Sequence, residues 1–209
     1  MTIQELSVRF DNIARDINYG PVLGDIMTGA ASMAHDLIYM RVHGSGVNAE
    51  GQKYISPSGN GTSYSTKEML IGCKGFKNTA NCSRVFGKKK NKELKWVTLD
   101  KTGSNGKKIR LAVLDGGYKK FRELNDLQSG FVDFAFSNRM WTDITVKKDR
   151  NELNRGIARI GAIHEEEQKK LEGNTGRFGE ILMLSQKEIG EVSDFFNGEI
   201  DKILRKQGL

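Results

Sequence analysis

The segment Gly116–Lys147 reads GGYKKFRELNDLQSGFVDFAFSNRMWTDITVK and contains the clearest structural signals in the chain. Its leading glycine pair predicts a backbone conformation that other residues rarely adopt. A turn at Ser129-Gly130 precedes Phe131–Phe136, where alternating apolar side chains predict a strand buried on one face. A second short strand is expected around Asp143–Lys147. The segment therefore predicts a turn that leads into a two-stranded core.

Four further strands are expected on either side of this segment. Leu94–Leu99 and Ile109–Leu114 predict a β-hairpin, because Thr102–Gly106 between them has the small and polar residues of a turn. Short strands are expected at Met69–Ile71 and at Gly156–Ile160. The sheet is predicted to be mostly antiparallel.

Two helices are expected in the N-terminal part of the chain. From Thr2 to Asn18, apolar residues recur at steps of three and four, which is typical of one face of an amphipathic helix. Gly20-Pro21 interrupts this pattern and starts a second helix, because proline is well tolerated at a first helical position. The polar, glycine-rich residues Gly44–Thr66 then predict a long exposed loop.

Two more helices are expected in the C-terminal part. Ile163–Leu171 carries Glu and Lys residues four positions apart, which stabilise a helix, and Gly173–Gly176 is expected to end it. Ser185–Glu188 has the pattern of a capping box, which marks a helix start. The apolar residues that follow predict a last helix that extends to about Lys206.

This order of helices, strands and helices predicts one α+β domain over residues 1–209. Within it we expect a helical N-terminal part at 1–43, a loop and sheet part at 44–162, and a helical C-terminal part at 163–209.

The net charge of +7 is unevenly distributed along the chain. From Lys67 to Arg122 there are 16 Lys or Arg and 4 Asp or Glu, a net charge of +12, which leaves −5 for the rest. Within this range, Lys74–Lys92 is expected to be a basic, irregular loop. Such a surface suits DNA phosphates or an acidic protein, but a merely solvated basic surface has the same composition. The interleaved aromatic residues lack a recognisable stacking motif, so sequence-specific nucleic-acid recognition is not predicted.

Enzymatic function has little support in the sequence. The motifs of nucleophile elbows, phosphate-binding loops and dinucleotide-binding folds do not occur. His164 precedes three glutamates, but Gln168 stands where a zinc motif needs its second histidine. Asp133 is expected on a strand, without a partner for acid–base chemistry. No catalytic residue, metal site or cofactor is therefore predicted.

The N-terminus lacks the basic and apolar regions of a secretory signal. Cys73 and Cys82 are therefore expected to be reduced thiols. No apolar run approaches the roughly 20 residues of a membrane span. We expect a protein that is made and kept in a cytoplasm, without membrane contact.

The same central segment resembles a known family. The resemblance is carried by Gly117-Tyr118-Lys119-x-Phe121-Arg122-Glu123-Leu124, then Gln128, then Val132-Asp133-Phe134, then Ser137-x-x-Met140. This run is similar to the phage virion-morphogenesis family, whose members act in tail completion and head–tail joining. Asn138 stands where the family usually has glycine, and asparagine tolerates the same left-handed backbone.

Two flanking regions extend the resemblance over most of the chain from about Gly44. They are Gly46-x-Asn48-Ala49-x-Gly51-x-Lys53 with Tyr64-Ser65-Thr66-Lys67, and Arg177-Phe178-Gly179 with Leu184-Ser185. The resemblance implies a structural virion protein that is assembled in the host cytoplasm. It implies a cyclic homo-oligomer, six- or twelve-fold, in the neck or at the tail top, with DNA passing through its centre. Portal, adaptor or tail proteins are the implied neighbours. A small non-specific nucleic-acid-binding protein is the alternative.

Candidate residues follow from the basic stretch and from the resemblance. The candidate contacts with a neighbouring subunit or with channel DNA are Lys74, Lys77, Lys88, Lys89, Lys90, Lys92, Tyr118 and Arg122. Tyr118 and Arg122 are expected either to hold a loop or to meet a neighbouring subunit. The candidate structural motif is Gly116, Gly117, Asp133, Asn138 and Met140.

Overall fold

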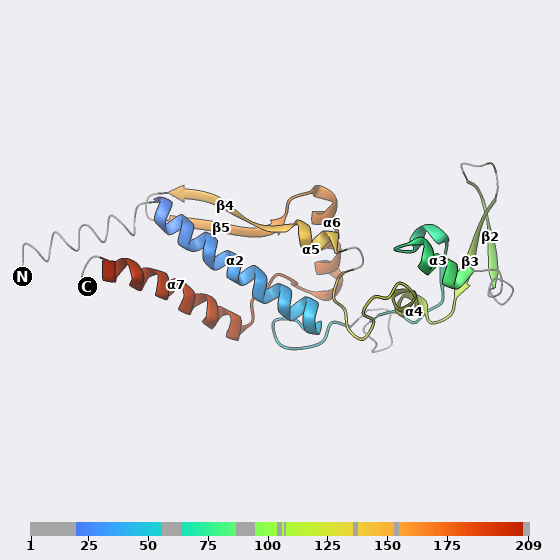
Figure 1. Cartoon of the computed structure of the whole chain (residues 1–209), viewed down its shortest axis with the longest axis horizontal. Coiled ribbons are helices and arrows are strands. Elements are labelled where there is room, and N and C mark those ends of the chain that lie inside the picture. The colour runs from blue at the N-terminus through green and yellow to red at the C-terminus, as the bar shows by residue number, and fades with distance from the viewer. Residues whose placement is uncertain are drawn as a thin grey trace, which may run out of the picture.

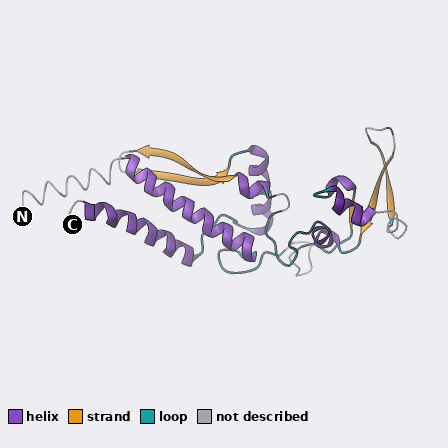
Figure 2. Cartoon of the chain, viewed as in Figure 1, coloured by secondary structure: helices purple, strands orange, loops and turns teal. Residues whose placement is uncertain are grey.

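A computed structural model describes residues 20–55, 64–86, 95–103, 106, 108–135, 138–152 and 155–206. It has the mixed α+β composition that the sequence predicts, with helices and small antiparallel sheets (Figure 2). Figure 1 shows that the described elements form two lobes along the longest axis. Each lobe has its own hydrophobic cluster. The predicted division of a single domain into three parts stays a prediction.

The first lobe, here the long-helix lobe, combines elements from both ends of the chain. It contains α2 (Gly20–Ser45), α5 (Arg139–Asp143), β4 (Ile144–Glu152), β5 (Arg155–Ala162), α6 (Glu165–Phe178) and α7 (Gln186–Lys206). Helix α2 lies between the β4–β5 ribbon and α7 (Figure 1). Its apolar face packs Ile38 and Val42 against Trp141 and Ile144, and all four side chains are buried. The predicted second helix is thus confirmed, whereas the expected helix at Thr2–Asn18 lies outside the described residues.

The start of α7 is tied to α2 by one carboxylate. Glu188 Oε2 accepts a hydrogen bond from the Ser185 N–H at 2.7 Å, and Ser185 Oγ accepts one from the Glu188 N–H at 3.3 Å. Glu188 Oε1 also accepts a hydrogen bond from Arg41 Nε at 2.8 Å. The capping box and the last helix to Lys206 are therefore confirmed, and the box additionally anchors α7 to its neighbour.

The second lobe, here the hairpin lobe, is continuous in sequence. It contains β1 (Met69–Ile71), the 3₁₀ helix η1 (Cys73–Gly75), α3 (Thr79–Phe86), β2 (Trp96–Thr102), β3 (Lys108–Leu114) and α4 (Gly117–Leu124). Its sheet has the order β1-β3-β2, and both pairings are antiparallel. Ile71, Phe76, Ala112 and Phe121 are buried in its core. The predicted hairpin and the short strand at Met69–Ile71 are confirmed.

The strands at 143–147 and 156–160 are also confirmed, but they extend further, as β4 and β5, and pair with each other. Within the described residues, the strands thus form two separate small sheets rather than one. The reason is that each sheet packs against the hydrophobic cluster of its own lobe: Ile144 belongs to one cluster, and Ile71 and Ala112 belong to the other.

The strand predicted at Phe131–Phe136 is wrong for its described residues, 131–135. These residues have no strand pairing, and Phe134 has a φ of 52°, in the left-handed region. Val132, Asp133 and Ala135 are all buried, so burial does not alternate as it would on a strand. The apolar residues are frequent here because this segment lies where the two lobes meet, with side chains rather than a neighbouring strand as its partners.

Two expectations for loops and helix ends are also corrected. Helix α6 continues through Gly173 and Gly176 to Phe178, and Gly179, with a φ of 85°, follows its last residue. The helix tolerates the two glycines because Leu171 and Phe178 pack on either side of them in the long-helix lobe. The region 74–92 is not wholly irregular, since it includes most of η1 and all of α3.

The predicted loop at 44–66 is not wholly exposed in its described residues. An isolated bridge pairs Val47 with Lys53. Tyr54 and Tyr64 are 3% and 6% exposed. Both rings lie in the cluster of the long-helix lobe, so the two ends of this region contribute to the core.

Cys73 and Cys82 form a disulfide, which corrects the expectation of reduced thiols. The bond links η1 to α3 across a sequence separation of 9, with the two Cα atoms 5.3 Å apart. Cys82 is buried against the core of the hairpin lobe. The disulfide therefore closes a short loop on that core.

Reduction of this disulfide is expected to lower the free energy of unfolding by about 2–3 kcal/mol, because the bond restricts the unfolded chain. Urea denaturation with and without dithiothreitol measures the difference. The double variant Cys73→Ser/Cys82→Ala is the control, and its midpoint should not respond to the reductant. A wild-type midpoint that is equally insensitive would show that the bond contributes nothing to stability.

Among the described residues, no helix is both long enough and apolar enough to cross a bilayer.

Candidate functional site at the junction of the two lobes

Arg122 of α4 is the centre of the contact between the lobes. Its side chain is 1% exposed, so its charge needs partners inside the protein. The Nη2 atom donates to both carboxylate oxygens of Asp133, at 2.8 and 2.9 Å. The Nε and Nη1 atoms donate to the carbonyl oxygens of Gln128 and Ala135, at 2.6 and 2.7 Å. One guanidinium thus bonds to three residues, Gln128, Asp133 and Ala135, two of which lie in the expected strand.

Tyr64 completes this buried group, here the Arg122–Asp133–Tyr64 network. Its hydroxyl donates to Asp133 Oδ1 at 2.8 Å and accepts from the Asp133 N–H at 3.1 Å. The Arg122 guanidinium lies over the Tyr64 ring, 4.5 Å from its centroid. Burial raises the pKa of Tyr64 well above its usual range, so the hydroxyl stays protonated and can donate. The Asp133 carboxylate thus accepts hydrogen bonds from Tyr64, Arg122 and the Ala135 N–H, as a structural group of the junction.

The glycine pair brings α4 close to the chain entering the hairpin lobe. Gly116 and Gly117 have φ values of 86° and 58°, as the sequence predicts. A Cβ atom on Gly117 would lie 2.1 Å from the carbonyl oxygen of Lys67. The Lys119 N–H donates to the carbonyl oxygen of Ser65 at 3.0 Å. Only glycine at position 117 allows this approach of two backbones.

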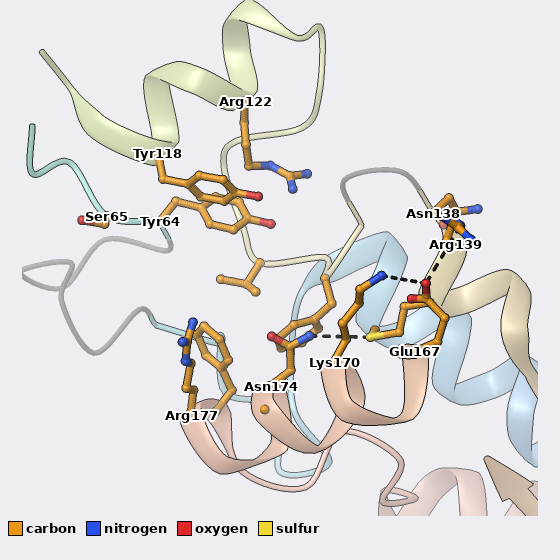
Figure 3. A pocket seen from close by; sticks show the side chains of 15 residues that line it. Tyr64, Ser65, Tyr118, Arg122, Asn138, Arg139, Glu167, Lys170, Asn174 and Arg177 are labelled. Carbon is orange, nitrogen blue, oxygen red and sulfur yellow. Dashed lines mark hydrogen bonds and ion pairs between the residues drawn. The ribbon is translucent and has the colours of Figure 1, made fainter. Parts of the chain in front are cut away.

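A cavity of about 680 Å³ lies beside the network, between α4 and α6 (Figure 3). Tyr118 and Arg122 reach it from α4, and Lys170, Asn174 and Arg177 reach it from α6. Its other lining residues are Tyr64, Ser65, Val132, Phe134, Asn138, Arg139, Met140, Glu167, Gly173 and Phe178. The cavity thus combines aromatic walls with positively charged groups.

The buried carboxylate of this cavity is Glu167, which is 3% exposed. Its Oε1 atom accepts from Lys170 Nζ at 2.6 Å and lies 3.9 Å from Arg139 Nε. Its Oε2 atom is buried and has no hydrogen-bond partner among the residues that the structure describes. The Lys170 charge is therefore compensated within the cavity wall.

The start of α6 is held by Asp143, from the end of α5. The Asp143 carboxylate accepts hydrogen bonds from the His164 and Ile163 N–H groups, at 2.8 and 2.9 Å, and also contacts His164 Nδ1. The bond from the His164 backbone is the main reason why the pKa of Asp143 lies below its usual value. This carboxylate fixes the orientation of the helix that lines the cavity. Within the described residues, no cluster of His, Cys, Asp and Glu is suited to a metal ion.

The junction brings together the predicted structural motif and part of the predicted interface. Asn138 has a φ of 61°, so the left-handed backbone expected there is present. It precedes α5, in which Met140 is buried. Tyr118 is half-buried in the cavity wall. Arg122 is buried and saturated with partners, so it holds a loop and is not available to a neighbouring subunit or to DNA.

The lysines predicted to contact a neighbour or DNA lie elsewhere. Lys74 and Lys77 are exposed on the hairpin lobe, away from the cavity. The others, Lys88, Lys89, Lys90 and Lys92, lie outside the described residues.

Sequence reasoning missed much of the cavity wall. Glu167, Lys170, Asn174 and Arg177 are spaced by three and four along α6, and this spacing could have indicated a common face. In the sequence, Gly173 and Gly176 within that spacing indicate a helix end, so the common face is not apparent. For Tyr64, no local signal predicts a partner 69 positions away.

The described lining residues include no His or Cys, and Glu167 is the one carboxylate among them. The cavity wall therefore offers aromatic rings and positively charged groups to a ligand. Comparisons of the chain with protein-family models, with curated proteins and with solved structures gave no match.

Proposed function

We propose that this protein is a structural virion protein of a tailed bacteriophage. It forms a homo-oligomeric ring in the neck or at the top of the tail, and takes part in tail completion and head–tail joining around the DNA channel. The observation that carries the proposal is the ordered run from Gly117 to Met140, which resembles the tail-completion family. The positions of these residues in the structure support the proposal. Four residues of the run, Gly117, Arg122, Asp133 and Met140, contribute to one junction. Residues that maintain a common scaffold are expected to gather in this way.

The shape and charge of the molecule support the same proposal. A ring needs a heterologous interface, in which one face of each subunit meets a different face of the next. Two dissimilar lobes supply such faces (Figure 1). The hairpin lobe, Met69–Leu124, covers almost the whole range that carries the net charge of +12. This lobe is the proposed contact with channel DNA or with an acidic neighbouring ring.

The test is made on particles of the phage whose genome encodes the chain. The protein is expected to co-purify with tailed particles in a density gradient, in six or twelve copies per particle by quantitative mass spectrometry. Without its gene, DNA-filled heads and separate tails should accumulate, because head–tail joining fails. A copy of the gene on a plasmid is the control and should restore joined particles. Absence of the protein from purified particles, or normal infectivity without its gene, would contradict the proposal.

Non-specific nucleic-acid binding is the second candidate, and the +12 range favours it. In that case the isolated protein should bind duplex DNA as a monomer or dimer. Its affinity should fall steeply with salt concentration, because phosphate contacts release counterions. Such binding, together with absence from particles, would select this candidate over the ring.

A further inference from the structure

The cavity between α4 and α6 has the size and the walls of a ligand-binding site. Its volume of about 680 Å³ lies within the ~300–1,000 Å³ range of ligand pockets. The rings of Phe134 and Phe178 meet edge to face at 5.1 Å and 77°, and those of Tyr64 and Tyr118 at 5.5 Å and 70°. Rings arranged in this way form apolar corners that accept a side chain. They do not form the parallel, open faces on which successive bases stack.

The four positively charged side chains of the cavity wall differ in their partners. Arg122 is paired with Asp133, whereas Lys170 and Arg139 share the single carboxylate of Glu167. Arg177, in the last turn of α6, is exposed and has no hydrogen bond or ion pair within the described part of the chain. The Tyr118 hydroxyl likewise has no hydrogen-bond partner there. An occupant with one negative charge could pair with Arg177, and its hydrogen-bonding groups could bond to the Tyr118 hydroxyl.

The length of the site follows from the spacing along α6. Glu167 and Arg177 lie at opposite ends of the row that α6 presents to the cavity (Figure 3). At 1.5 Å per residue, their Cα atoms are separated by about 15 Å along the helix axis. An extended chain covers this distance in about four or five residues.

We propose that this cavity binds an extended, acidic segment of another protein, in which Asp or Glu lies next to an aromatic or large aliphatic residue. The apolar side chain lies between Tyr118, Phe134 and Phe178. The carboxylate pairs with the Arg177 guanidinium, whose planar donors match it. The Tyr118 hydroxyl and the Asn174 amide bond to the main chain of the segment.

A nucleic acid fits the same cavity poorly. Its backbone carries a negative charge on every nucleotide, so it needs a row of free cations. In the cavity wall, Arg122 is paired with Asp133, and Lys170 and Arg139 share the carboxylate of Glu167. Arg177 is the cation without a partner in the described part of the chain. A phosphate at the other end of the row would also be repelled by the carboxylate of Glu167, whereas the single carboxylate of the proposed segment lies at the Arg177 end. This chemistry belongs to the cavity itself, so failure of the virion proposal leaves the peptide proposal intact.

The test is a titration of the ¹⁵N-labelled full chain with the peptide acetyl-Gly-Phe-Glu-Gly-amide, followed by NMR at low salt. The amide signals of Gly173, Asn174 and Arg177 are expected to shift and to saturate with one dissociation constant. Arg177→Glu is expected to weaken binding at least about tenfold, because it replaces a charge-assisted hydrogen bond with repulsion. Arg205→Glu is the matched control, since Arg205 is likewise an exposed arginine in the last turn of a helix, and should leave the affinity unchanged.

Two peptide changes test the proposal on the wild-type protein, independently of how any variant folds. Replacing the peptide's Glu by Gln, or its Phe by Ala, should each weaken binding at least about tenfold. Unsaturable shifts, or equal affinities for Arg177→Glu and Arg205→Glu, would overturn the proposal. So would a hexameric oligothymidylate that shifts the same signals at lower concentration than the peptide, since the cavity would then be a nucleic-acid site.

Discussion

Replacing Arg122 with alanine is expected to lower the free energy of unfolding by about 3–5 kcal/mol, because it leaves the buried Asp133 carboxylate without its counter-charge. The same change also removes the donors that hold the Gln128 and Ala135 carbonyl groups. Chemical denaturation followed by tryptophan fluorescence measures the loss, since Trp141 donates to the Asp133 carbonyl at 2.9 Å and reports on this site.

The chain offers a matched control for this substitution. Arg84 pairs with Asp126 at 2.6 Å, but the two side chains are 53% and 60% exposed. Solvent screens this pair, so Arg84→Ala should cost no more than about 1 kcal/mol. The difference between the two variants isolates the effect of burial. Equal losses would mean that the Arg122–Asp133–Tyr64 network does not stabilise the junction.

Replacing Gly117 with alanine is expected to lower the melting temperature by about 10 °C. The new Cβ atom would lie 2.1 Å from the Lys67 carbonyl oxygen, at a backbone φ of 58°. Because backbone atoms cannot turn aside as a flexible side chain can, α4 has to move away from the chain that enters the hairpin lobe. A loss of about 4 kcal/mol corresponds to such a shift for a domain of about 200 residues.

Gly106 separates the two causes of this loss. It also has a positive φ, of 71°, but nothing lies within 4 Å of a Cβ atom built there. Gly106→Ala should therefore lower the melting temperature by only about 3 °C, the effect of backbone strain alone. Differential scanning calorimetry of both variants measures the contrast. If the two variants melt together, the close approach at Gly117 is not required.

The junction shows which side-chain partners could be predicted and which could not. The left-handed backbone at Gly116, Gly117 and Asn138 was predictable, because residue type alone favours it. The pairing of Arg122 with Asp133 was not, although only 11 positions separate them. In a strand at 131–136, the alternation of side chains between the two faces would have set the direction of the Asp133 side chain. Phe134 instead has a left-handed backbone, with a φ of 52°, and Asp133 and Ala135 on either side of it both bond to Arg122.

The sequence by itself determined those elements whose stabilising contacts lie within a few residues along the chain. The hairpin, the capping box at Ser185–Glu188 and the last helix depend on contacts within a few residues, so their signals are complete in the sequence. Only the tertiary structure decided that α6 continues through its glycines, that the strands form two sheets, and that Tyr64 meets Arg122. In each case the stabilising partner comes from a distant part of the chain. Because the Arg122 charge is buried, it requires hydrogen-bonding partners inside the protein, and no local sequence pattern indicates where those partners lie.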